Sequence, residues 1–201
     1  EYTYAFAGWS ENGTDVIDLS NATVKGNKTY TAVYTQTKNT YTVNFYDEDK
    51  TALLETKTVE YGTPATITSV PTKVADAEYT YTFEKWLNKA DDTDADVTNV
   101  VANMDVYAQY SKTKNKYTVE FYDEDGTTKI GDSTVDYGAT ATAPTATKTE
   151  DNTYTYVFEK WVTTVGGTAE DDLSNVIANR NVYATYTPVY KEYKVEFVDE
   201  D

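Results

Sequence analysis

The chain has 201 residues, of which 34 are acidic and 17 are basic, and it contains neither cysteine nor histidine. Its formal charge of −17 repels nucleic-acid phosphates and anionic lipids, so we expect neither as a partner. Without cysteine and histidine there can be no disulfide, no thiolate or imidazole metal ligand and no histidine proton shuttle, and we expect no cofactor.

Residues that favour β-structure are abundant. The chain has 20 tyrosines, 6 phenylalanines and 3 tryptophans but a single methionine, and threonine and valine are frequent. This composition predicts a mainly β fold. No apolar run approaches the roughly 20 residues of a membrane helix, so we expect no membrane insertion within this segment.

A nine-residue segment recurs at a spacing of 76 residues, starting at Tyr41, Tyr117 and Tyr193. Such a period predicts small modules copied in tandem. It divides the chain into the C-terminal half of a repeat (1–40), two full repeats (41–116 and 117–192) and the first strand of a further repeat (193–201). A second frame, with repeats at 1–77 and 78–152, is the alternative, but the linker composition favours the first.

Within one repeat, the elements follow in a regular order. Tyr41, Val43 and Phe45 alternate with polar residues, which predicts a half-buried strand. An acidic turn follows, which in the next repeat contains Asp125-Gly126, and residues 55–61 are expected to return as the hairpin partner. Residues 65–70 are predicted to be a short strand or extended edge that ends at Pro71.

The second half of the repeat begins with an aromatic strand over residues 79–86. Trp86 follows Phe83 by three residues, a spacing that suggests a bulge, and Gly8 in the first copy would suit the kink. Asn99–Asn103, with its match Asn175–Asn179, is expected to form one helical turn. Residues 106–110 form the last strand, and 111–116 are predicted to be a short, semi-rigid polar linker.

These motifs together resemble a known family. Tyr-Thr-Val-x-Phe, Tyr-Gly, Tyr-x-Phe-x-x-Trp and Val-Tyr-Ala-x-Tyr are similar to the Listeria–Bacteroides repeat, the B repeat of internalin-type surface proteins. Here Tyr110 and Tyr186 stand where the family more often has tryptophan, and Asp-Glu-Asp replaces its usual Asn-Gly-Gly turn. The resemblance implies tandem β-grasp-like repeats of about 76 residues in an elongated array, on extracellular proteins of Gram-positive and gut bacteria, with no shared catalytic residues.

Acidic loops suggest a calcium site, with Asp123, Asp125 and Asp132 as oxygen donors near a tight turn. The pattern of an EF-hand is incomplete, and Lys50 stands where the next repeat has Gly126. The run Asp91–Asp96 is less specific, because its match in residues 166–172 changes the carboxylate spacing. We interpret both as solvated loops and assign no metal ligand.

Three further kinds of site are conceivable: a catalytic carboxylate pair, an isopeptide crosslink and a platform of exposed aromatic residues. Paired carboxylates could act on a glycosidic bond, but 34 acidic residues make chance pairs inevitable, so we predict no enzyme and no catalytic residue. Lys85 or Lys160 with Asn99 or Asn175 raises the idea of an isopeptide crosslink, which the spacing does not require. Tyr81, Phe83 and Trp86 are predicted to be core, and the better candidates for exposed, ligand-stacking aromatics are Tyr46, Tyr122, Tyr79 and Tyr154.

We therefore expect a non-catalytic extracellular repeat region at the surface or cell wall of a bacterium, acting as a stalk, a spacer or part of an adhesive fibre. The alternative is an adhesin module that binds a host glycan or protein through repeated weak sites. A third interpretation is a spacer within a secreted glycan-degrading enzyme. The expected partners are neighbouring repeats, a host glycan or protein, and, through the incomplete terminal repeats, other copies end to end.

Overall fold

The structure is a computed structural model that describes residues 1–200, and the chain divides into two compact units. The first unit comprises residues 1–73 and 82–111, and the second comprises residues 74–81 and the chain from Lys112 onward. Every regular element within residues 1–200 is a strand, and no helix occurs among them.

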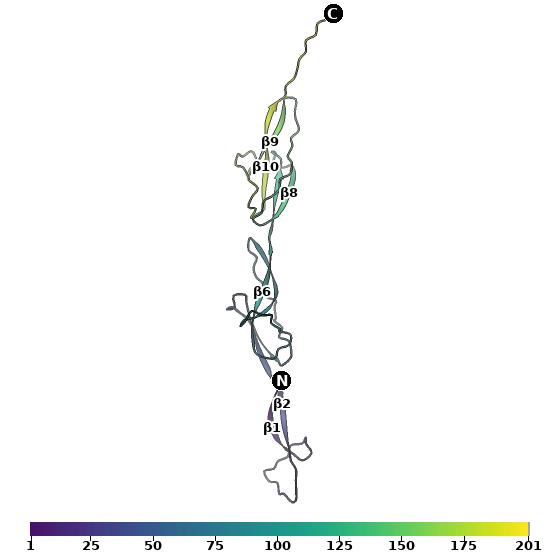
Figure 1. Cartoon of the computed structure of the whole chain (residues 1–201), viewed down its shortest axis with the longest axis vertical. Coiled ribbons are helices and arrows are strands. Elements are labelled where there is room, and N and C mark those ends of the chain that lie inside the picture. Colours follow the sequence, from purple (N-terminus) through teal and green to yellow (C-terminus); the bar gives the residue numbers. More distant parts are fainter. Residues whose placement is uncertain (201) are drawn as a thin grey trace. The chain divides into compact units, whose positions relative to one another are not determined.

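The first unit contains a hairpin and a four-stranded sheet. In the hairpin, β1 (Tyr2–Ser10) pairs antiparallel with β2 (Thr31–Lys38), and the two strands run side by side in Figure 1. The sheet has the order β4-β3-β6-β5, with antiparallel β3–β4 and parallel β3–β6 pairs. Its strands are β3 (Thr40–Tyr46), β4 (Leu53–Glu60), β5 (Tyr79–Asn88) and β6 (Met104–Lys114).

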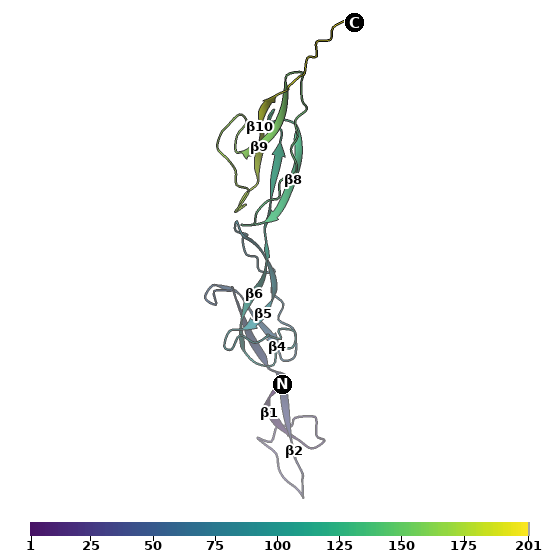
Figure 2. The ribbon, with the colours of Figure 1, turned by 45° about the horizontal axis from the view of Figure 1, so that its top comes forward.

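The second unit repeats the same sheet, in the order β8-β7-β10-β9. Figure 2 labels three of these strands, β8, β9 and β10. The strands are β7 (Lys116–Tyr122), β8 (Lys129–Asp136), β9 (Tyr154–Val162) and β10 (Arg180–Tyr190). In both sheets the first and last strands of the repeat form a central parallel pair, and one further strand lies on each side of it. The outer pairs β3–β4, β7–β8 and β9–β10 are antiparallel. This order is that of the β-grasp fold and confirms the predicted class of mainly β, β-grasp-like tandem repeats.

One face of each sheet carries the core. In the first unit, Val43 and Phe45 of β3 are fully buried with Val106 and Ala108 of β6, and Trp86 is 8% exposed. The alternation of β3 places its apolar residues on one face, as the sequence predicted. The second unit buries the residues at the same repeat positions: Val119, Phe121, Trp161, Val182 and Ala184.

Irregular chain, rather than a helix, covers the core face. Of the two alternatives predicted for residues 65–70, the short strand is wrong, because no strand is formed there; Ala65 is buried and its amide donates to the Val97 carbonyl at 2.8 Å. The helical turn expected at Asn99–Asn103 is also wrong. There Val100 is fully buried and forms a single antiparallel bridge with Thr63, which fixes this segment in an extended form.

The predicted bulge before the tryptophan is confirmed. In the hairpin, Phe6 pairs with Tyr34 and Gly8 with Val33, so Ala7 is the extra residue. The register of β9 against β10 shifts at the corresponding place, between Phe158 and Lys160. At Gly8 a Cβ atom would lie 2.3 Å from a Val16 methyl group, so a larger residue there would force Val16 to move.

The segments expected to be linkers belong to strands. Residues 111–114 continue β6, and Asn115 alone separates β6 from β7, just as Asn39 separates β2 from β3. The expected semi-rigid linker at 111–116 is therefore corrected to one joint residue between two strands. Beyond β10, residues 191–200 have no assigned strand, and Phe197 is 94% exposed. Their assignment to a further repeat stays a prediction.

Candidate functional surfaces

The tryptophan expected to fill the core does so. The ring of Trp86 lies 4.8 Å from that of Phe45 and 5.0 Å from that of Phe83, between centroids. Tyr110 packs on the same cluster, and its hydroxyl donates to Asp47 at 3.1 Å. Burial, with the nearby Asp47 carboxylate, raises the pKa of Tyr110 to about 12. Tyr81 differs from the expectation: it lies outside the cluster and donates to Asp76.

The four tyrosines proposed as ligand-stacking residues are half-buried and engaged with neighbours. The ammonium of Lys89 lies 3.7 Å from the centre of the Tyr46 ring, and Lys112 lies 4.4 Å from that of Tyr79. The other two tyrosines meet the aromatic residue opposite them on the neighbouring strand, Tyr122 with Tyr183 at 5.9 Å and Tyr154 with Tyr190 at 4.6 Å. They form cross-strand pairs rather than open platforms.

The acidic hairpin tips use their carboxylates within the turn. Asp125 accepts hydrogen bonds from the amides of Thr127 and Thr128, both at 2.8 Å, and from the Thr128 hydroxyl at 2.7 Å. These donors, the Thr128 hydroxyl first, lower the pKa of Asp125 to about 2. Gly126 has a φ of 72°, and Lys50 takes the same left-handed conformation at the equivalent place with a φ of 61°.

The three aspartates considered as calcium donors, Asp123, Asp125 and Asp132, do not form a metal site. Asp132 pairs with Lys129 at 2.9 Å instead of turning toward Asp125, whose oxygens are already hydrogen-bonded. Across residues 1–200, no group of three or more acidic side chains is placed to hold a metal ion. The carboxylates at the hairpin tips therefore hold the turn together, which is the usual role of aspartate in such loops.

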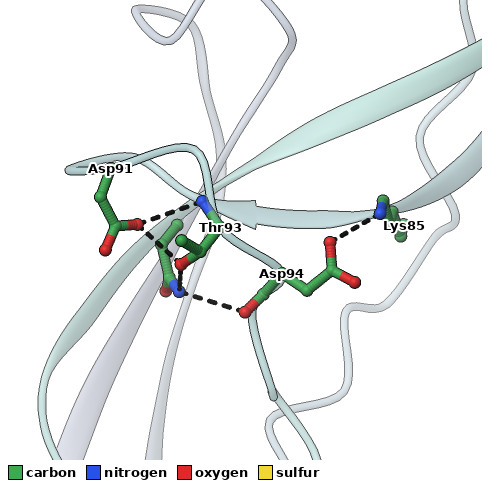
Figure 3. A network of polar contacts seen from close by, with 5 residues as sticks. Lys85, Asp91, Thr93 and Asp94 are labelled. Atoms are coloured by element: carbon green, nitrogen blue, oxygen red, sulfur yellow. Dashed lines mark hydrogen bonds and ion pairs between the residues drawn. The ribbon is translucent and has the colours of Figure 1, made fainter.

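The acidic loop after β5 is also held by internal contacts (Figure 3). Asp91 accepts from the amide and the hydroxyl of Thr93, at 3.1 and 2.7 Å, and Asp94 binds the Lys85 ammonium at 2.6 Å. In the first unit, Lys85 is thus paired with Asp94 and not with Asn99, its suggested isopeptide partner.

A groove of about 570 Å³ near β4 contains two carboxylates, Asp47 and Glu55. Glu55 is fully engaged: it binds Lys57 at 2.6 Å, and its other contacts are the amide and hydroxyl of Thr68, each at 2.7 Å. The Lys57 ammonium and then these donors lower the pKa of Glu55 to about 2. Such a carboxylate carries no proton at neutral pH and is unsuited to act as a general acid.

The joint residues Asn39 and Asn115 make corresponding polar contacts in the two units. In the first unit, the Asn39 amide donates to the Glu1 carbonyl at 2.9 Å, and its carbonyl accepts from Tyr61 at 2.8 Å. In the second unit, the Asn115 amide donates to Glu78 and its carbonyl accepts from Tyr137, both at 2.8 Å. Each joint residue is therefore hydrogen-bonded through its backbone on both sides.

The side chains of the joint residues add a second set of bonds. Asn39 accepts from the Thr3 hydroxyl at 2.6 Å, and Asn115 accepts from the Thr80 hydroxyl at 2.7 Å. The Asn115 amide group also donates to the carbonyl of Asp76 at 2.8 Å. Sequence reasoning missed this role, although the recurrence of asparagine at the same repeat position was a signal that could have indicated it.

The Listeria-Bacteroides repeat domain matches the chain twice in tandem, at residues 41–109 and 117–185. The chain belongs to the Listeria-Bacteroides repeat family. Repeats of this family are typical of bacterial surface proteins, and such repeat families are generally non-catalytic. Each match covers 69 residues, and the two matches include most of the strands of the two four-stranded sheets. No helix suited to crossing a membrane is found within residues 1–200.

Among solved structures, the chain is similar to the Streptococcal High Identity Repeats in Tandem (SHIRT) domains 3-4 from a cell surface protein. The two chains share 18% sequence identity, and the match covers 75% of this chain and 99% of the other with a TM-score of 0.37. Because that score reflects only partial superposition, the fold assignment rests on the strand order and the family match. No curated protein shows significant similarity to the chain.

Proposed function

We propose that these Listeria-Bacteroides repeats form a non-catalytic spacer in an extracellular bacterial protein, a stalk or part of an adhesive fibre at the cell surface or wall. The observation that carries the proposal is where the chain enters and leaves each repeat. In the second unit it enters at the start of β7 and leaves at the end of β10, and these two strands are parallel neighbours.

This connection suits a load-bearing repeat. When the two ends of a repeat are pulled apart, parallel neighbouring strands slide past one another, so their hydrogen bonds are loaded together instead of one after another. The pairs between β7 and β10 run from Arg180–Val119 to Tyr183–Tyr122 beside a fully buried core. A module built in this way is expected to resist extension along the chain.

The surface chemistry supports a spacer over an adhesin. The half-buried tyrosines are engaged with neighbouring side chains, and one of their positions reads Tyr46, Tyr122 and Val198 in successive copies. A repeated binding site would keep its contact residue in every copy. The proposed partners are therefore the neighbouring repeats of the same protein, and the excess of acidic residues is expected to keep a dense array soluble.

Single-molecule pulling tests the load-bearing geometry. Because the chain has no cysteine, two introduced cysteines define the points of attachment. Pulling between K116C and Y190C loads the parallel pair in shear. The control pair, K116C and D136C, lies at the paired ends of the antiparallel β7–β8 hairpin and unzips it.

We expect the shear pair to rupture at a severalfold higher force than the control at the same loading rate. Equal forces in the two directions would remove the mechanical argument. Binding to a host glycan or matrix protein that is lost in Y122A and Y46A, with both variants still folded, would favour the adhesin instead.

A further inference from the structure

The two full repeats bury the same side chains, so packing alone does not distinguish them. Each sheet consists of a leading pair of strands (β3 with β4, β7 with β8) and a trailing pair (β5 with β6, β9 with β10). The buried Val43 and Phe45 of the first leading pair return as Val119 and Phe121 in the second, and the central parallel strands meet in the same register. A leading pair therefore finds an equally good core in the trailing pair of the other repeat.

Repeats with matching cores risk exchanging these halves while they fold, and such misassembly is a characteristic failure of repeat proteins. Chain topology removes one exchange. Parallel neighbours need a connection of about a dozen residues or more, so β7 cannot turn back beside β6 across the single residue Asn115. The exchanges left are β3 with β10 within one chain, and either leading pair with the trailing pair of the other repeat between two copies.

The repeats differ in the residues that face each other across the parallel strands, on the face away from the core. In the first unit, Asn44 of β3 lies opposite Asp105 of β6, and its amide group donates to that carboxylate at 2.8 Å. In the second unit, Glu120 of β7 lies opposite Asn181 of β10. We call these two pairs the boundary pairs. Each contains one carboxylate and one uncharged amide, but the carboxylate has changed sides.

Lys129 of β8 belongs to the second arrangement. Its ammonium binds Glu120 at 2.7 Å and Asp132 at 2.9 Å, whereas the equivalent residue of the first unit is Leu53, which carries no charge. If β7 accepted β6 from another copy, Asp105 would lie directly opposite Glu120. Like charges in this position destabilise a sheet, so the wrong trailing pair meets repulsion where the right one brings an amide.

The turn of each leading pair adds a second difference. In the first unit, Lys50 forms an ion pair with Asp92 in the loop after β5, and its ammonium lies 4.4 Å from the centre of the Tyr107 ring. In the second unit, Gly126 takes the place of Lys50, and a Cβ atom there would lie 2.5 Å from a methyl group of Val165. The second trailing pair therefore has no room for the lysine of the first turn.

We propose that the boundary pairs and the two turn contacts form a recognition code, by which each leading pair selects the trailing pair of its own repeat. The half that is rejected is that of the other repeat, in the same chain or in a neighbouring copy. Exposed pairs of this kind add little to stability, but selection depends on the difference between the right and the wrong partner, which repulsion and steric contact increase. The code is independent of the proposed spacer function.

Charge exchange at one boundary pair tests whether the facing residues recognise each other. N44E sets a second carboxylate opposite Asp105 and should lower the Tm, by up to about 4–8 °C. N44E with D105N copies the arrangement of the second unit and should restore most of the loss. N44Q lengthens the side chain without adding charge and should change little. Differential scanning calorimetry measures all three, and a double variant no more stable than N44E would overturn the proposal.

Refolding tests the selection itself. The variant E120N/G126K/V165D/N181D gives the second repeat the code residues of the first. Its formal charge stays at −17, because two changes each add one positive unit and two each remove one. Each leading pair then accepts two kinds of trailing pair instead of one, so after dilution from denaturant we expect about twice the share of exchanged dimers. Size-exclusion chromatography with light scattering measures this share.

The matched control is N44E/D105N/E120N/N181D, which moves each boundary pair to the other repeat and so keeps the two codes distinct. It should refold as the unchanged chain does. Exchanged dimers persist when the sample is diluted, since they separate only by unfolding, whereas ordinary association reverses. An equal share of persistent dimers in the unchanged chain and in E120N/G126K/V165D/N181D would overturn the proposal, as would an increased share in the control.

Discussion

Trp86 is the residue on which the core of the first unit most depends. Its ring contacts those of Phe45 and Phe83, and the sheet has a single covered face, so no neighbouring layer can refill the space. We expect W86A to lose about 3–5 kcal/mol of unfolding free energy, the usual cost of removing a buried tryptophan. Such a loss should unfold this repeat.

Chemical denaturation followed by circular dichroism measures the effect. W161A is the matched variant and should unfold the second repeat while leaving the first one folded. Because Trp9 is 44% exposed, W9A should cost much less than W86A. A W86A chain with unchanged stability would contradict the core assignment.

At the residue scale, the sequence predicted apolar contacts better than polar ones. Alternation placed Val43 and Phe45 on the core face, and the Phe83-to-Trp86 spacing revealed the bulge. The partners of the acidic side chains could not be predicted, because Asp125 and Asp94 lie in loops whose conformation decides which groups they meet. The surplus of acidic residues raised the idea of metal sites. In the structure, these carboxylates instead accept hydrogen bonds from nearby amides, hydroxyls and ammonium groups.

At the scale of elements, Asn115 is the feature with the clearest consequence. Its side chain bonds to Thr80 and Asp76, while its backbone bonds do not depend on the side chain. N115A should therefore leave both sheets folded, with a cost below about 1 kcal/mol because the lost bonds are exposed. Amide exchange around residues 76–80 and 115 should become faster.

Hydrogen exchange of the variants measures the faster exchange, and X-ray scattering checks that both sheets stay folded. N115D keeps the acceptor for Thr80 but loses the donor to Asp76, so it should lie between the unchanged chain and N115A. N115K copies the residue found at position 191 and should behave as N115A does. Unchanged exchange in all three variants would show that the backbone bonds alone hold the joint.

Strands of this chain could be predicted from the sequence, whereas its irregular segments could not. β3 and β4 follow from alternation and a turn motif. The run Asn99–Asn103 was expected to be helical from its local pattern, but Val100 is drawn into the core and bridges Thr63, a contact far along the chain. The polar residues 111–114 looked like a linker because pairing with a neighbouring strand leaves no mark in composition.

At the scale of the whole molecule, charge is the dominant feature. The formal charge of −17 leaves an excess of carboxylates after every basic residue is counted. The ion pairs, such as Lys85–Asp94 and Lys129–Glu120, are exposed, and pairs of this kind contribute only about 0–1 kcal/mol each. Repulsion among the unpaired carboxylates should therefore outweigh attraction within the pairs, and salt should stabilise the fold.

We expect the Tm of the chain to rise as NaCl increases, because the Debye length falls from about 30 Å at 0.01 M to about 3 Å at 1 M. Differential scanning calorimetry at constant pH measures the change. Sucrose at matched osmolality is the control, since it adds no screening, and only the excess rise in NaCl counts. A Tm that falls with NaCl would mean that the ion pairs, and not the repulsion, decide the electrostatic balance. If repulsion dominates, E84Q, which neutralises a carboxylate outside those pairs, should raise the Tm at low salt; if the ion pairs dominate, it should not.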